Sequence, residues 1–220
     1  MKSISLILIL LFFTNFIPAQ MSTSSPIIRQ RPIKLDQKRI DLSLEYMKMH
    51  YGIIQKEPTI VPKMIVLHYT EGGTLESNIQ YFKAPYLSSR PDLTDGSNLN
   101  VSAQFIIDRD GSIYQLLPSN FFARHTIGLN YCAIGVENIG GSKNPLTAAQ
   151  VNANAYLIRY LSEKYPIEYL IGHSEYFIFR NTRLWKDKNP NYYTQKFDPG
   201  EEFMQQLRAK VQDLHLKNQP

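Results

Sequence analysis

The chain has one cysteine, Cys132, among its 220 residues. An intramolecular disulfide is therefore excluded, and the fold must rely on its hydrophobic core. Because the neighbours of Cys132 are apolar, we expect its thiol to be buried and inert.

Long hydrophobic runs are scarce as well. The main one, residues 4–13, is shorter than the roughly 20 residues that a membrane-spanning helix needs. It follows the basic residue Lys2 and is followed by Ala19, a small residue suited to signal peptidase. Residues 1–19 therefore read as a secretory signal peptide, with an uncleaved anchor as the alternative. We expect an exported protein, periplasmic or secreted, with no membrane span in its mature form.

Neither sign of charge dominates. The 24 Lys and Arg residues against 19 Asp and Glu give a net charge of +5, and loss of Lys2 leaves 23 − 19 = +4. These charges are spread along the chain, so no nucleic-acid partner is expected. An acidic wall polymer or a membrane surface remains compatible with them. The remaining residues, about 200, suffice for one domain, which we expect to be a monomer.

Hydrophobic periodicity predicts an α/β fold, a mixed central β-sheet flanked by helices. We expect an N-terminal arm and helix at residues 20–62 to pack on a main domain at 63–217, with residues 20–35 extended. Asp-Gly at positions 110–111 predicts a hairpin. The expected strands are 64–70, 103–108, 112–117, 132–138 and 167–173; the expected helices are 41–51, one after Thr74, one from the Thr147/Gln150 capping box to about Tyr165, and one through Phe203, Leu207, Val211 and Leu214.

Three separate residues suggest a metal site. His68 and His173 each close a strand that looks buried, and Asp198 opens the last helix. These side chains could converge at one edge of the sheet, as the ligands of a metallohydrolase would. Taken singly, a histidine on an apolar strand is more often a hydrogen-bonded core residue. Asp198-Pro-Gly-Glu201 also reads as a capping box with proline at the first helical position.

Six segments over residues 60–210 resemble, in the same order, the zinc-dependent N-acetylmuramoyl-L-alanine amidases of the type 2 amidase and peptidoglycan-recognition-protein superfamily. No single motif is decisive, but their joint order is. The segments are Met64-Ile-Val-Leu-His-Tyr-Thr70, Val101-Ser-Ala-Gln-Phe-Ile-Ile-Asp-Arg-Asp-Gly-Ser-Ile-Tyr-Gln115, Ala123-Arg-His125, Ala133-Ile-Gly-Val-Glu-Asn138, Gly172-His-Ser174 and Lys196-Phe-Asp-Pro-Gly200.

The resemblance implies a Zn²⁺ ion held by His68, His173 and Asp198, with the fourth position open, as in catalytic zinc sites. It implies that Glu137 is the acid/base that takes a proton from the attacking water and passes it to the leaving amine. It also implies that Lys196 stabilises the developing oxyanion. A structural ion pair for Glu137 and a surface position for Lys196 are the alternatives.

Other positions are assigned to the cleft. His125 matches a family histidine in the groove and is assigned to substrate contact or a secondary proton role. Tyr69, Asn138 and Trp185 are assigned to substrate binding as well. His50 and His215 match nothing in the family and are expected to be solvated. Gln104 stands where relatives often carry histidine or another residue.

The spacing of the last two ligands departs from the family pattern. His173 and Asp198 are 25 positions apart, more than in the shorter bacterial members. The additional residues, 179–195, are expected to loop out and form a wall of the cleft that grips sugar or stem peptide. A tolerated surface insertion is the alternative. Asp187, the only other carboxylate inside this segment, is the alternative third ligand.

The function implied is hydrolysis of the bond between the lactyl group of N-acetylmuramic acid and L-alanine, in peptidoglycan or in muropeptides. A non-catalytic peptidoglycan-binding module is the first alternative, although such modules commonly lack a ligand at the position of Asp198. A zinc peptidase is the second, but the sequence contains no His-Glu-x-x-His motif.

Overall fold

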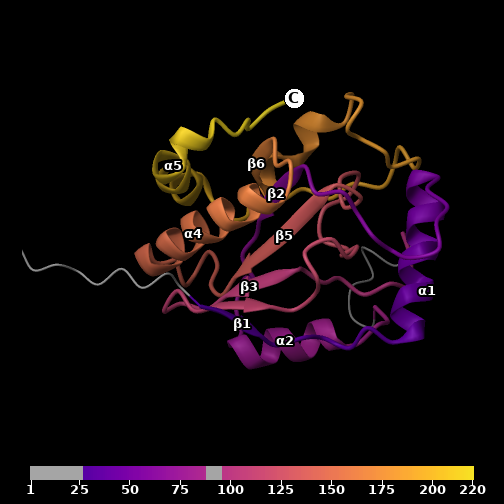
Figure 1. Cartoon of the computed structure of the whole chain (residues 1–220), viewed down its shortest axis with the longest axis horizontal. Coiled ribbons are helices and arrows are strands. Elements are labelled where there is room, and N and C mark those ends of the chain that lie inside the picture. The colour runs from indigo at the N-terminus through magenta and orange to yellow at the C-terminus, as the bar shows by residue number, and fades with distance from the viewer. Residues whose placement is uncertain (1–26, 88–95) are drawn as a thin grey trace, which may run out of the picture.

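The computed structural model describes residues 27–87 and 96–220. Figure 1 shows a central sheet with helices packed against it. The expected signal peptide lies outside the described residues. Within those residues, every helix is too short or too polar to cross a membrane.

The sheet has six strands in the order β1-β4-β3-β5-β2-β6. The hairpin of β3 and β4 is antiparallel, as Asp-Gly predicts, and all other neighbours are parallel. A mixed sheet is therefore confirmed. The strands are β1 (Ile28–Gln30), β2 (Met64–Leu67), β3 (Phe105–Ile107), β4 (Ile113–Gln115), β5 (Ala133–Asn138) and β6 (Tyr169–Gly172).

Helices cover both faces of the sheet. α4 (Ala148–Lys164) and α5 (Glu201–Lys210) lie together on one face, where they bury the side chains of Ile65, Ile134 and Leu170. The other face is covered by α1 (Gln37–Tyr46), its continuation η1 (Met47–Tyr51), α2 (Leu75–Lys83) and the short helix η2 (His173–Phe179). A last short helix, η3 (Gln212–Leu214), follows α5.

Local sequence explains where these helices begin. Thr74 and Ser77 form a capping box at α2, and Thr147 and Gln150 form the expected one at α4. The buried guanidinium of Arg39 on α1 donates to the carbonyls of residues 82–84, at the end of α2. A cation placed there satisfies carbonyls that have no helical partner, and so it ties α1 to α2.

The N-terminal arm contributes a strand that the sequence pattern does not indicate. Residues 28–30 pair in parallel with β4, and Ile33 just beyond them is 2% exposed. A three-residue strand at the sheet edge is too short to show a clear alternation, and its pairing depends on β4, over 80 positions away.

Candidate active site

The strand register brings the candidate residues together. β2 lies between β5 and β6 and runs parallel to both, and Leu67 is paired with Val136 on one side and Gly172 on the other. The next position along each strand is His68, Glu137 and His173 respectively. Equivalent positions on neighbouring parallel strands point to the same face about 4.8 Å apart. All three side chains therefore gather at the carboxyl ends of the strands, where open α/β sheets form their binding sites.

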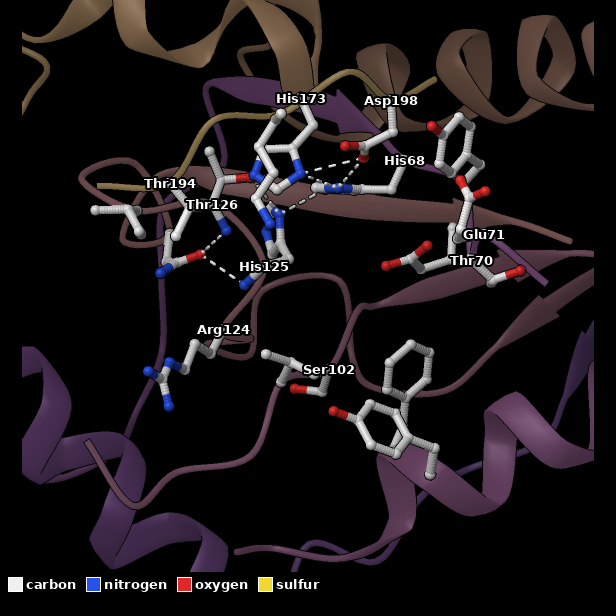
Figure 2. A pocket seen from close by; sticks show the side chains of 18 of the residues that line it. His68, Thr70, Glu71, Ser102, Arg124, His125, Thr126, His173, Thr194 and Asp198 are labelled. Carbon is white, nitrogen blue, oxygen red and sulfur yellow. Dashed lines mark hydrogen bonds and ion pairs between the residues drawn. The ribbon is translucent and has the colours of Figure 1, made fainter. Parts of the chain in front are cut away.

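His68, His173 and Asp198 form a compact cluster (Figure 2). The Nδ1 atoms of the two histidines are 3.0 Å apart. Asp198 Oδ2 lies 3.2 Å from Nδ1 of His68 and 3.1 Å from Nδ1 of His173. All three side chains are buried. Two imidazole nitrogens and one carboxylate oxygen converging on a point form a donor set suited to a transition-metal ion.

Asp198 is held in place by its backbone and not by a helix-capping role. Its carbonyl accepts a hydrogen bond from the backbone N–H of Ser174 at 2.8 Å. Its neighbour Pro199 packs so closely on Gly172 that a Cβ there would lie 2.9 Å from the proline ring. The alternative reading, a capping box at Asp198, is not found, because α5 begins at Glu201 and its N-cap, Gly200, makes no side-chain hydrogen bond.

The charge states in the cluster favour metal binding. Burial lowers the pKa of His173 to about 4, and the nearby His68 adds to this effect, so the His173 ring is neutral near pH 7. Burial tends to raise the pKa of Asp198, but interactions with His173 and His68 outweigh it and hold this pKa well below its usual range. A neutral imidazole and an ionised carboxylate are the forms that bind metal ions.

Glu137 stands beside this cluster with an unusual environment. Burial raises the pKa of its carboxyl group to about 7, and Asp198 raises it further, while His68 and Lys196 lower it. Its Oε2 atom is buried and makes no hydrogen bond among the described residues. A carboxyl group with one unpaired oxygen atom and a pKa near neutrality is suited to accept and release a proton.

These groups line one cavity of about 280 Å³. It contains the three cluster residues and, from the sequence-based predictions, Glu137, Lys196, Tyr69 and His125. Burial, together with a hydrogen bond to Glu71, raises the pKa of Tyr69 to about 12, so its hydroxyl remains protonated at neutral pH.

His125 touches a cluster residue directly. Its Nδ1 atom lies 3.1 Å from Nε2 of His68, on the side of that ring away from Asp198. Its Nε2 atom lies 3.2 Å from the carbonyl oxygen of Ala133. Burial, with the neighbouring His68 as the next cause, lowers the pKa of His125 well below its usual range, so the ring is neutral.

Two residues assigned to the cleft do not line this cavity. Asn138 follows Glu137 on β5 and therefore faces the other side of the sheet, where its amide donates to the carbonyl of His68 and accepts from Asn154. Trp185 packs over Gly128, where a Cβ would lie 2.6 Å from the indole ring. The alternation of side chains along β5 accounts for Asn138.

His50 is buried, contrary to the expected solvated position. It is 5% exposed, its Nδ1 lies 3.0 Å from Asp187 Oδ2, and its Nε2 contacts the carbonyl oxygen of Gly96. Asp187 is thus paired with His50 and is not part of the His68 cluster. His215 is exposed, as expected.

The cavity also contains residues that the motifs do not single out. Arg124 is 3% exposed, and its guanidinium donates to the hydroxyl of Tyr192 at 2.7 Å. Thr194 and Glu71 line the cavity too. Arg124 precedes His125 in one of the six segments that resemble the amidases. Its position in the sequence is therefore a signal that could have indicated its place in the cavity. Tyr192 and Thr194 reach the cavity only through the path of the segment that precedes Asp198.

Comparisons with known proteins identify a family and similar folds. Residues 57–201 match the family described as N-acetylmuramoyl-L-alanine amidase. The structure resembles N-acetylmuramoyl-L-alanine amidase LysC from Clostridium intestinale, with 22% identity and a TM-score of 0.54 over 87% of this chain and 99% of that one. It also resembles bumblebee PGRP-SA, with 20% identity and a TM-score of 0.51 over 89% and 99%.

No curated protein sequence matches the chain. Both structural likenesses fall below 25% identity and therefore concern the fold alone. The family match spans well over half of the 220 residues and includes every residue of the cluster. By its sequence, the chain belongs to the N-acetylmuramoyl-L-alanine amidase family.

Proposed function

We propose that the protein is a zinc-dependent amidase that hydrolyses the amide bond between N-acetylmuramic acid and L-alanine in peptidoglycan or muropeptides. The observation that carries the proposal is the convergence of Nδ1 of His68, Nδ1 of His173 and Oδ2 of Asp198 in the cavity that Glu137 also lines. These three atoms would hold the zinc ion. When bound, zinc supplies Lewis acidity, which polarises the scissile carbonyl and acidifies water.

The protein's own groups would move the proton and stabilise charge. Glu137 takes a proton from the attacking water, because its carboxylate has no competing hydrogen-bond donor at Oε2. It returns this proton to the amine as the amide bond breaks. Lys196 lines the same cavity and would offset the negative charge that develops on the carbonyl oxygen.

The cavity's lining suits a substrate that is part sugar and part peptide. Tyr69, Asn78 and Ser102 offer hydroxyl and amide groups, and Ile127 and Val101 offer apolar surface. A few polar groups on a partly apolar wall are typical of sites that orient a small organic ligand. We further propose that the protein acts after export, on wall material outside the cytoplasm.

The test combines chemistry with a matched variant. Purified protein is incubated with a defined muropeptide, and the products are identified by mass spectrometry with and without a chelator. We expect release of the free stem peptide, its loss with the chelator and its recovery with added zinc. Binding without any product would support the alternative, a non-catalytic peptidoglycan-binding module.

Glu137→Gln separates catalysis from metal binding. The variant keeps the size of the side chain but loses the base, so turnover should fall about 100-fold or more while zinc stays bound. Glu163→Gln, the same change at an exposed position on α4, is the control and should leave turnover unchanged. Turnover near the wild-type value in Glu137→Gln would make Glu137 a structural residue.

A further inference from the structure

The ring of His125 has identifiable partners at both nitrogens. Nε2 faces the carbonyl oxygen of Ala133 at 3.2 Å. Nδ1 faces the hydroxyl of Thr126 at 2.8 Å and Nε2 of His68 at 3.1 Å. The His125 and His68 rings meet edge to face at an interplanar angle of 87°.

These contacts favour one placement of the protons. A carbonyl oxygen only accepts, so Nε2 of His125 must carry the hydrogen that is donated to Ala133. In a neutral ring Nδ1 is then an acceptor. His68 Nε2 and the hydroxyl of Thr126 both lie within hydrogen-bond distance of this acceptor, and a hydrogen on His68 Nε2 would be donated to it. In that tautomer the remaining nitrogen of His68, Nδ1, has a lone pair on the side of Nδ1 of His173 and Oδ2 of Asp198.

The surroundings of His125 hold its ring in this position. Gly135 on β5 lies directly under the ring, where a Cβ would come within 2.8 Å of Cγ of His125. The backbone N–H of Gly135 donates to Oε1 of Gln104 at 2.7 Å, and the amide of Gln104 donates to the carbonyl of Phe121. The carboxamide oxygen of Asn130 accepts from the backbone N–H of His125 at 2.9 Å. Ring and backbone are thus both constrained.

We propose that His125 is a positioning residue that holds His68 in its Nε2–H tautomer, so that the lone pair of Nδ1 is directed at the metal position. A metal-binding histidine commonly donates its second ring N–H to such a partner, and loss of that partner typically weakens metal binding 10–100-fold. The proposal rests on the zinc site proposed above. It gives His125 the role of supporting the metal ligand His68 and not that of contacting the substrate.

The first test needs no metal. Nitrogen-15 NMR of the imidazole groups in the metal-free protein reports which nitrogen of His68 carries hydrogen. We expect hydrogen at Nε2. Hydrogen at Nδ1 in the wild-type protein would overturn the proposal, whether or not the protein proves to be an amidase.

The second test measures zinc affinity by competition with a chelator. His125→Leu fills the space but removes the acceptor, and its affinity should fall about 10–100-fold. His125→Asn places an oxygen near the position of Nδ1 and should stay within a few-fold of the wild type. His215→Leu, the same change at an exposed histidine, is the control and should not alter affinity.

The outcomes separate the competing roles. Wild-type zinc affinity in folded His125→Leu would overturn the positioning role and leave substrate contact. Circular dichroism shows whether His125→Leu folds. If it does not fold, the test is made with His125→Asn, and loss of zinc binding in this variant would contradict the acceptor role. A wild-type protein that binds no zinc would refute the proposed function, while the NMR result would still decide the tautomer.

Discussion

At the scale of single residues, Glu137 is a group whose ionisation depends on pH near neutrality. Its pKa is about 7 in the folded protein, chiefly because of burial, against an ordinary value of 4.5. Between these values the folded protein keeps the proton and the unfolded chain has lost it. This contribution to stability is therefore present below about pH 4.5 and disappears as the pH rises through about 7.

The prediction compares metal-free wild type with Glu137→Gln. The variant cannot ionise, so its free energy of unfolding should rise relative to the wild type as the pH increases between about 4.5 and 7, and the difference should level off above that. Urea denaturation at several pH values measures this difference. The titration of the histidines is common to both proteins and cancels if it is independent. A difference that does not change with pH would show that folding does not raise the pKa of Glu137.

The three cluster residues should each be needed for zinc. His68→Ala, His173→Ala and Asp198→Ala each remove one donor atom, and the strands behind them can still pack through their apolar neighbours. We expect loss of zinc with the fold retained, measured by elemental analysis and circular dichroism. Full zinc occupancy in any one variant would remove that residue from the ligand set.

Asp187→Asn provides the matched control at the carboxylate within residues 179–195. Asp187 contacts His50 at 3.0 Å, so its replacement should leave zinc in place. The free energy of unfolding should fall by about 1–3 kcal/mol, because a buried hydrogen-bonded partner is altered. Loss of zinc from this variant would mean that the segment controls the position of Asp198.

At the scale of elements, the segment between His173 and Asp198 is packed into the fold. Phe179 and Tyr192 are buried, and the backbone N–H groups of Lys186 and Lys188 donate to the carbonyls of Gly128 and His50. From Thr194 to Asp198 alternate side chains line the cavity. Replacing the whole segment by a linker would therefore expose the core, so single exposed side chains are the better test.

Phe177 and Tyr193 are exposed aromatic residues of this region. Their ring centroids are 5.5 Å apart, and the guanidinium of Arg180 lies over both. Aromatic and basic side chains together suit sugar rings and carboxylates. We predict that Phe177→Ala/Tyr193→Ala raises KM for polymeric peptidoglycan and leaves kcat nearly unchanged.

Kinetics on wall polymer and on a small muropeptide measure this effect. Tyr165→Ala, at the end of α4 on the opposite face of the sheet, is the control. Unchanged KM on both substrates would show that the exposed face of the segment takes no part in binding.

At the scale of the whole molecule, the N-terminal arm is part of the sheet. The backbone N–H groups of Arg31 and Ile33 donate to Gln115 and Leu116, and Ile33 is buried. The reference is a chain that begins at Ile27, the first described residue. A chain that begins at Asp36 should unfold roughly 4–12 °C lower, because burial of one isoleucine contributes about 2–3 kcal/mol. Equal melting temperatures in calorimetry would make β1 dispensable.

Local signals in the sequence determined most of the elements. The capping residues Thr74 and Thr147, the Asp-Gly turn and the apolar runs all act within a few positions of each other, so the chain shows them directly. The metal cluster was indicated by a resemblance of ordered motifs. His68, His173 and Asp198 are too far apart in the chain for any local pattern to join them.

Tertiary structure decided the rest, because a pairing between segments far apart in the sequence produces no local pattern within either segment. The parallel register of β2, β5 and β6 placed His68, Glu137 and His173 side by side. Burial of His50 against Asp187 depends on two segments 137 positions apart. The position of His125 beside His68 depends on Gly135 lacking a side chain, and a glycine within a strand does not by itself indicate which ring will occupy that space.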